Sequence, residues 1–228
     1  MRVILLLAVA VTAKKPESCD ADGLAFIDGY KDVTEQTGPF PEKAAEAAGL
    51  PKVPLRVLDL QWLQVIGEGW AAPLRGFMRE GVLLQTLHFN SYHVDTDGGS
   101  AIHEAKTDFD NFNPEAQYFS RVSSSVPIVL PISKEIKGAL EGKSACTLVS
   151  PTGEDIAILR DPEVYDHRKE ELIARMYGAA DLDHPYIAEN ILPAGEFLLG
   201  GEIELLKRIT YNDGLDEFRL TPNEVKAA

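Results

Sequence analysis

The sequence predicts an α+β fold built around a small β-barrel. Its 228 residues suffice for one domain, or for one domain with a sizeable arm, but not for two full domains. Short strand patterns are mixed with helical patterns, without the regular alternation of strand and helix that a parallel sheet requires. Hydrophobic residues make up 45% and charged residues 25% of the chain, which is typical of a soluble protein whose core needs neither disulfides nor metals.

Residues 1–13, MRVILLLAVAVTA, have the features of a secretory signal peptide. Arg2 gives a short positive start, the apolar stretch that follows is too short to span a bilayer, and Ala10 or Ala13 offers a cleavage position. We therefore expect targeting to the secretory pathway or to another signal-dependent organelle such as a plastid. The alternatives are a buried first strand or a wrongly assigned start, and a wrong start would place the protein in the cytoplasm.

Residues 14–50 are polar and interrupted by Pro and Gly, so we expect an arm or linker that ends in a short Ala/Glu-rich helical turn. The domain itself is predicted over residues 51–228. It contains an acidic loop insertion near residues 95–122, because residues 95–115 hold six Asp or Glu side chains against one lysine. Deletion of residues 97–119 is expected to leave the fold intact.

Three patterns predict strands. Residues 144–150 and 156–160 are separated by Pro-Thr-Gly-Glu-Asp, which indicates a β-hairpin. Residues 125–132 are rich in Val and Ile, but their two prolines restrict this strand to an edge or a barrel rim. Residues 202–205 alternate between polar and apolar, as a half-buried strand does.

Two patterns predict helices. Residues 172–177 place their apolar side chains on one helical face, and Gly178 follows where a glycine often ends a helix. Thr221, Pro222 and Glu224 match a capping box, with Thr as N-cap, Pro at the first helical position and Glu three residues after the cap. Few residues follow this start, so we interpret it as a helix whose body has been cut away.

The charge balance disfavours nucleic acid as a partner. The chain has 22 Lys or Arg against 36 Asp or Glu, and its formal net charge is −14. Binding to phosphates needs clustered basic residues, whereas acidic residues here are spread along nearly the whole chain. The same surface repels sulfate and ATP on average, so a site for either anion requires a basic pocket elsewhere.

Three motifs that suggest chemistry fail on spacing. Residues 138–144 resemble a phosphate-binding loop, but only three residues separate the glycines and a strand pattern follows. A calcium loop starting at Asp95 would place Lys106 where a glutamate is needed. The histidines within residues 88–103 lack the spacing of zinc ligands. We therefore predict no catalytic, cofactor-binding or metal-binding residue in this chain.

A family resemblance begins at residues 59–80, DLQWLQVIGEGWAAPLRGFMRE. This segment resembles the N-terminal signature of ATP sulfurylase (sulfate adenylyltransferase) and is most similar to the version in the sulfurylase part of bifunctional PAPS synthases. Further similar segments follow in order at residues 87–89, 125–130, 156–163, 167–171, 184–187, 197–201 and 211–222. The acidic insertion and the apolar start depart from the family pattern.

The resemblance implies a PUA-like pseudobarrel that packs on a nucleotidyltransferase domain. The family makes adenosine 5′-phosphosulfate and diphosphate from ATP and sulfate, in sulfate assimilation and PAPS biosynthesis. Its catalytic signatures, Gln-x-Arg-Asn and His-x-x-His, follow the PUA-like domain, and this chain contains neither. ATP and Mg are thus expected to bind a catalytic domain that partners this chain in cis or in trans, and the chain alone is expected to be inactive.

Within the signature we expect residues of a domain interface or a structural role, not substrate contacts: Trp70, Pro73, Arg75, Gly76, Phe77 and Met78. The alternative function is a non-catalytic binding or regulatory protein of the same fold. An RNA-binding PUA module is a third class, which the acidic charge disfavours.

Overall fold

The computed structural model describes residues 41–95, 119–178 and 182–227. The elements in chain order are α1 (Pro41–Ala48), β1 (Lys52–Pro54), α2 (Val57–Gly67), β2 (Gly76–Phe77), α3 (Glu80–Phe89), β3 (Ser91–Asp95), β4 (Phe119–Ser123), β5 (Leu130–Ile132), α4 (Lys134–Leu140), β6 (Ala145–Val149), β7 (Asp155–Asp166), α5 (Lys169–Tyr177), η3 (Ile187–Ile191), β8 (Phe197–Leu205), η4 (Asp216–Phe218) and α6 (Pro222–Ala227). The α+β prediction is confirmed.

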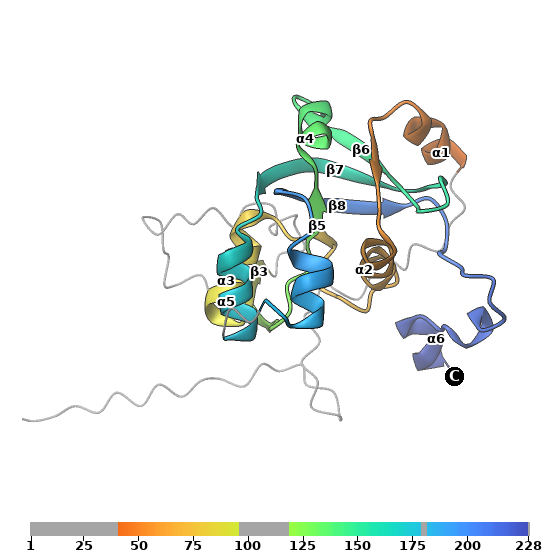
Figure 1. The fold of residues 1–228 in the computed structure, drawn as a ribbon. Helices are drawn as coiled ribbons and strands as arrows, with labels where there is room; N and C mark the ends of the chain where they lie inside the picture. The colour runs from red at the N-terminus through yellow and green to blue at the C-terminus, as the bar shows by residue number, and fades with distance from the viewer. Residues whose placement is uncertain (1–40, 96–118, 179–181, 228) are drawn as a thin grey trace, which may run out of the picture.

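The central sheet has the strand order β1-β6-β7-β8-β2, and β5 also pairs with β8. Strand β8 changes partners along its length: its first residues pair with β5, and Gly201 and Glu202 pair with β2. Its neighbour β7 shifts register between Arg160 and Glu163. The extra residue in β7 is a β-bulge. In Figure 1, α3 and α5 lie below the sheet, and α1 and α4 lie above it.

Where β2 pairs with β8, the two backbones approach too closely for a side chain at two glycines. A Cβ placed on Gly76 would lie 1.8 Å from the carbonyl oxygen of Gly201, and one placed on Gly200 would lie 2.6 Å from that of Met78. Glycine is therefore required by close backbone approach at this seam, which we define as residues 76–78 and 199–201. The largest fully buried side chains of the core include several in or next to the seam: Phe77, Met78, Leu130, Leu159, Leu198 and Leu199.

The strand predictions hold in most respects. The predicted hairpin is formed by β6 and β7, which pair antiparallel, although β7 continues to Asp166. The strand predicted at residues 202–205 is the second half of β8. Of the edge strand predicted at residues 125–132, only Leu130–Ile132 pairs, and it pairs with β8 alone. The prolines limit this strand because a proline cannot donate to a ladder.

Both predicted helix ends are confirmed. Gly178 follows α5 with a φ of 71°, in the left-handed region that favours glycine. Before α6, the Thr221 N–H donates to Glu224 Oε2 at 2.7 Å, and the Glu224 N–H donates to Thr221 Oγ1 at 3.2 Å. This reciprocal pair is a capping box. It lies at the end of a segment that leads away from the sheet (Figure 1).

The domain boundaries are only partly within the described residues. Residues 1–40, with the predicted signal peptide and most of the predicted arm, lie outside them. The last part of that arm belongs to the fold, because Ala47 in α1 is fully buried and its carbonyl accepts a hydrogen bond from Thr147 Oγ1 at 2.7 Å. Most of the acidic insertion also lies outside, but its flanking residues Asp95 and Phe119 pair in the β3–β4 hairpin.

Candidate functional site

The signature segment between α2 and α3 has an outer and an inner part. The outer part, residues 69–75, is a series of tight turns, which we call the outer loop. Backbone hydrogen bonds of 2.9 to 3.2 Å, donated by Ala71, Ala72 and Leu74, close these turns. Pro73 is buried beneath them, after a cis peptide bond. The loop is therefore held in one shape by its own backbone.

Two large side chains of the outer loop are neither fully buried nor paired with other side chains of the described part. Trp70 is 53% exposed. Arg75 is half-buried, and although its carbonyl accepts from the Ile203 N–H at 3.1 Å, its guanidinium has no partner among the residues that the structure describes. With the exception of Arg175, the other arginines whose side chains are described pair with carboxylates: Arg56, Arg79, Arg160, Arg168, Arg208 and Arg219.

The inner part of the signature is buried in the seam. Phe77 and Met78 are almost fully buried, and Gly76 pairs with β8. The Met78 N–H donates to Ile128 O at 3.0 Å, and Met78 O accepts from the phenol of Tyr165 at 2.6 Å. Burial raises the pKa of Tyr165 well above its usual range, so the phenol keeps the proton that it donates. Both backbone groups of Met78 are thus satisfied inside the core.

The last two residues of the signature form ion pairs at the start of α3. Arg79 donates to the carbonyl of Asp161 at 2.8 Å and pairs with Glu163 at 3.4 Å. The Glu80 N–H donates to the same Glu163 carboxylate at 3.1 Å, and the Glu80 side chain pairs with Arg168. These contacts tie the start of α3 to β7 and to the start of α5, which is a structural role.

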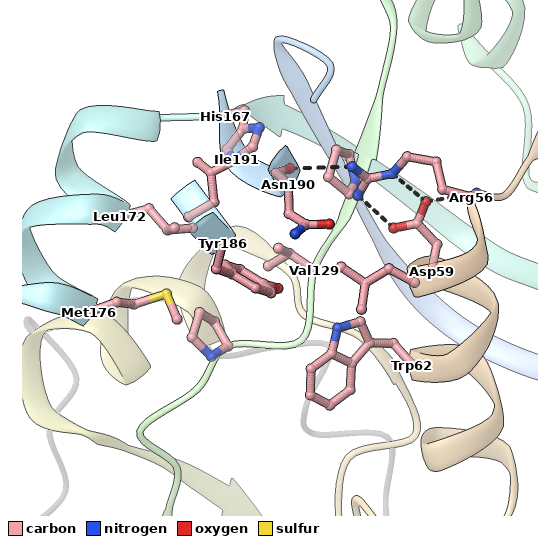
Figure 2. A pocket seen from close by; sticks show the side chains of 13 residues that line it. Arg56, Asp59, Trp62, Val129, His167, Leu172, Met176, Tyr186, Asn190 and Ile191 are labelled. Carbon is pink, nitrogen blue, oxygen red and sulfur yellow. Dashed lines mark hydrogen bonds and ion pairs between the residues drawn. The ribbon is translucent and has the colours of Figure 1, made fainter. Parts of the chain in front are cut away.

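A groove opens beside α2, between this helix, α5 and η3 (Figure 2). Asp59, only 2% exposed, accepts two hydrogen bonds from the Arg56 guanidinium, at 2.8 and 2.9 Å, and one from the Arg56 N–H at 3.0 Å. Arg56 also donates to Asn190 O at 3.2 Å. The groove encloses about 40 Å³, room for a few water molecules and not for a nucleotide. Its apolar walls include Trp62, Val129, Met176 and Tyr186.

His167 lines the same groove and is buried (Figure 2). Its Nδ1 lies 2.8 Å from the carbonyl oxygen of Gly195, so Nδ1 carries the proton and donates. Burial lowers the pKa of His167, and the positive charges of Lys169 and Arg56 lower it further, against the opposing effect of the Gly195 hydrogen bond. The imidazole is therefore neutral at pH 7 and holds the chain after β7 instead of supplying charge.

Parts of the three motifs that fail on spacing lie among the described residues. Residues 138–144 begin in α4 and lead into β6, so a strand and not a helix follows them, as predicted. His88 lies 2.9 Å from a carboxylate oxygen of Glu171. Asp95 ends β3, and the rest of the calcium-like segment lies outside the described residues. Cys146 is a free, buried thiol whose pKa burial raises to about 12, so it is not a nucleophile at neutral pH.

Neither a metal-binding cluster nor a membrane-spanning helix is found among the described residues. No cluster of three or more His, Cys, Asp or Glu side chains in residues 41–95, 119–178 and 182–227 is suited to hold a metal ion. None of the helices in these ranges has the length and apolar character needed to cross a bilayer.

The sequence patterns missed the contacts that organise the groove and the seam. Tyr165 and Met78 are 87 residues apart, so no local pattern links them. The pairing of Arg56 with Asp59 had a local signal, because Asp59 is the third residue of α2. A capping carboxylate usually occupies this position. That signal is weaker here than usual since the N-cap is an arginine.

Comparisons with known proteins identify the fold and its relatives. A family model described as a PUA-like domain matches residues 31–208. ATP sulfurylase 2 of Arabidopsis thaliana is 37% identical over 225 residues, and ATP sulfurylase 4, chloroplastic, of the same plant is 43% identical over 182. Sulfate adenylyltransferase of Symbiobacterium thermophilum is 29% identical over 191 residues. These matches cover 99%, 79% and 83% of this chain but only 42%, 34% and 41% of the relatives.

Among solved structures, the hexameric APS kinase from Thiobacillus denitrificans superimposes with a TM-score of 0.51 at 19% sequence identity, over 85% of this chain and 29% of that one. At this identity the likeness supports the fold alone. The helices and the mixed sheet agree with the predicted PUA-like α+β fold. The chain belongs to the PUA-like domain family, in the form that makes up the N-terminal domain of ATP sulfurylases.

Proposed function

We propose that this chain serves sulfate activation as the PUA-like part of a sulfate adenylyltransferase, which converts ATP and sulfate into adenosine 5′-phosphosulfate and diphosphate. The observation that carries the proposal is the match to ATP sulfurylase 2 over 99% of this chain, at 37% identity. The chemistry, together with ATP and Mg, is assigned to a nucleotidyltransferase domain that partners this chain in cis or in trans.

The charges of the chain favour a role in holding a catalytic partner over a role in binding the substrates. A net charge of −14 disfavours binding of ATP or sulfate, and the groove beside α2 is too small for a nucleotide. Arg56, which borders this groove, and Arg79, which directly follows the seam, are already engaged by Asp59 and Glu163. Such a domain contributes by holding and orienting a catalytic partner.

The test of this proposal is sulfate-dependent exchange of labelled diphosphate into ATP. The purified chain alone should show none. A chimera in which this chain replaces the matching region of Arabidopsis ATP sulfurylase 2 should be active, whereas the same enzyme with that region deleted should lose most of its activity. Robust turnover by the isolated chain, abolished by a point substitution in it, would contradict the proposal. An inactive but folded chimera would favour the binding or regulatory alternative.

We further propose import into a plastid, directed by the N-terminal segment that includes residues 1–13, with adenosine 5′-phosphosulfate made there feeding PAPS synthesis. The support is the apolar, basic start of the chain and the chloroplastic ATP sulfurylase among its relatives. N-terminal sequencing of the protein from its native cell tests the processing step. Recovery of the intact Met1 form from the cytosol would rule out targeting by this segment.

A further inference from the structure

The outer loop presents an aromatic side chain that the fold does not use. Trp70 is 53% exposed, although the neighbouring Leu74 is buried. The loss of solvent contact by an indole stabilises an interface strongly, and tryptophan is among the residues that dominate binding energies. A single exposed apolar side chain is ordinary on a protein surface, so Trp70 alone does not define a site.

Arg75 is the second feature of the loop. Its guanidinium is half-buried and lacks a carboxylate partner among the described residues, in a chain with 36 acidic side chains and 22 basic ones. Arg175, the other arginine in the described part without such a partner, is exposed, so its charge is solvated. Arg75 has lost part of its hydration without gaining a carboxylate, which leaves a cation available to a partner.

The backbone of the loop keeps both residues in place. Turn hydrogen bonds fix residues 69–74, and the pairing of Gly76 with Glu202 fixes the chain directly after Arg75. A preordered loop loses little conformational entropy on binding, so more of the contact energy appears as affinity. Exposure, charge and rigidity therefore coincide within one turn-rich loop.

We propose that the outer loop, residues 69–75, is a protein-docking surface. Its occupant is a patch of the sulfurylase catalytic domain where a carboxylate lies beside an apolar depression: Arg75 pairs with the carboxylate, and the Trp70 indole fills the depression. A free anion is disfavoured because it would leave the indole uncovered. The identity of the partner rests on the proposed function.

The test compares each substitution in two settings, the isolated chain and the active chimera with Arabidopsis ATP sulfurylase 2. Trp70→Ala and Arg75→Glu should leave the thermal midpoint of the isolated chain within about 1 °C, because neither side chain has a hydrogen-bond or ion-pair partner among the described residues that the change would break. In the chimera each should lower the midpoint of inactivation by about 3 °C or more, as loss of an interface anchor does. Phe89→Ala and Arg175→Glu are the matched controls, since both residues are exposed and lie outside the loop.

Two outcomes would overturn the proposal, and they are distinguishable. If the chimera is active and neither Trp70→Ala nor Arg75→Glu lowers its midpoint more than the controls do, the docking surface is wrong while the proposed function stands. If the unsubstituted chimera folds but is inactive, the proposed function fails and the docking surface fails with it. The chimera with Arg75→Lys should have a midpoint of inactivation between those of the unsubstituted chimera and of the Arg75→Glu variant. Lysine keeps the charge but loses the paired hydrogen bonds of the guanidinium.

Discussion

The seam and the outer loop are consecutive in the sequence but differ in almost every physical property. At the seam, Gly76 cannot accept even a methyl group and Met78 has every backbone group satisfied inside the core. In the outer loop, Trp70 faces solvent and the Arg75 guanidinium has no partner in the described part of the chain. One short signature thus combines a part that the fold requires with two side chains, Trp70 and Arg75, that the fold neither pairs nor fully buries.

The largest expected effect is at the seam. Gly76→Ala would place a Cβ 1.8 Å from the carbonyl oxygen of Gly201, where backbone and not a flexible side chain stands in the way. We expect a loss of about 3 kcal/mol or more in the free energy of unfolding, measured by urea denaturation. Gly138→Ala in α4 is the control, because nothing lies within 4 Å of its added Cβ and it should stabilise by about 0.5 kcal/mol or more. Equal effects of the two would refute the close approach.

The groove beside α2 should show an intermediate effect. Arg56→Ala leaves the Asp59 carboxylate, 2% exposed, without its guanidinium partner. We expect a loss of about 2 kcal/mol by chemical denaturation, below the value for a fully buried pair because Arg56 itself is 41% exposed. Arg168→Ala breaks a pair that is exposed on both sides and should change stability by about 0.5 kcal/mol or less. If the two substitutions are equivalent, Asp59 is better hydrated than the structure indicates.

His167 should give the groove a pH dependence. Its folded pKa lies below the ordinary value of 6.5, so the unfolded chain takes up the proton first as the pH falls. Stability is therefore full above about pH 6.5 and declines from there down to the folded pKa. His167→Asn keeps a donor for Gly195 O and should flatten this decline in urea midpoints measured from pH 7.5 to 5. An unchanged slope would show that other groups cause it.

Carboxylates with lowered pKa values affect stability in a different pH range from His167. Hydrogen bonds from Arg208 and from the Thr221 N–H lower the pKa of Glu224 to about 2, and pairing with Arg160 lowers that of Glu46. Their contributions are present above the unfolded value of about 4.5 and are lost only as the pH falls below it. They therefore do not mask the effect of His167.

The smallest effect is expected at the acidic insertion. Asp95 and Phe119 are direct partners in the β3–β4 pair, so replacing residues 96–118 with Asn-Gly places a two-residue turn between paired strand ends. The thermal midpoint should change by less than about 2 °C, since loop closure free energy varies slowly with length. A larger fall would show that the insertion packs on the domain and contributes to its stability.

The features that the sequence predicted are those whose contacts join residues close together in the chain. The β6–β7 hairpin, the helix ended by Gly178 and the capping box at Thr221 are local, and local patterns predicted them. The pairing of β2 with β8 joins segments that are far apart, so the need for Gly76 and Gly200 could be suspected only from the family resemblance. Exposure is equally non-local, and no pattern separates Trp70 from the half-buried Trp62.

The most direct test of the division between seam and outer loop is residue-resolved hydroxyl-radical footprinting of the isolated chain and of the active chimera. The rate of side-chain oxidation reports solvent contact at each position. In the isolated chain Trp70 should be oxidised rapidly, while Met78, which is 1% exposed, should be protected. In the chimera the account predicts that Trp70 becomes protected several-fold while Met78 stays protected. Equal oxidation of Trp70 in both proteins, with the chimera active, would contradict it.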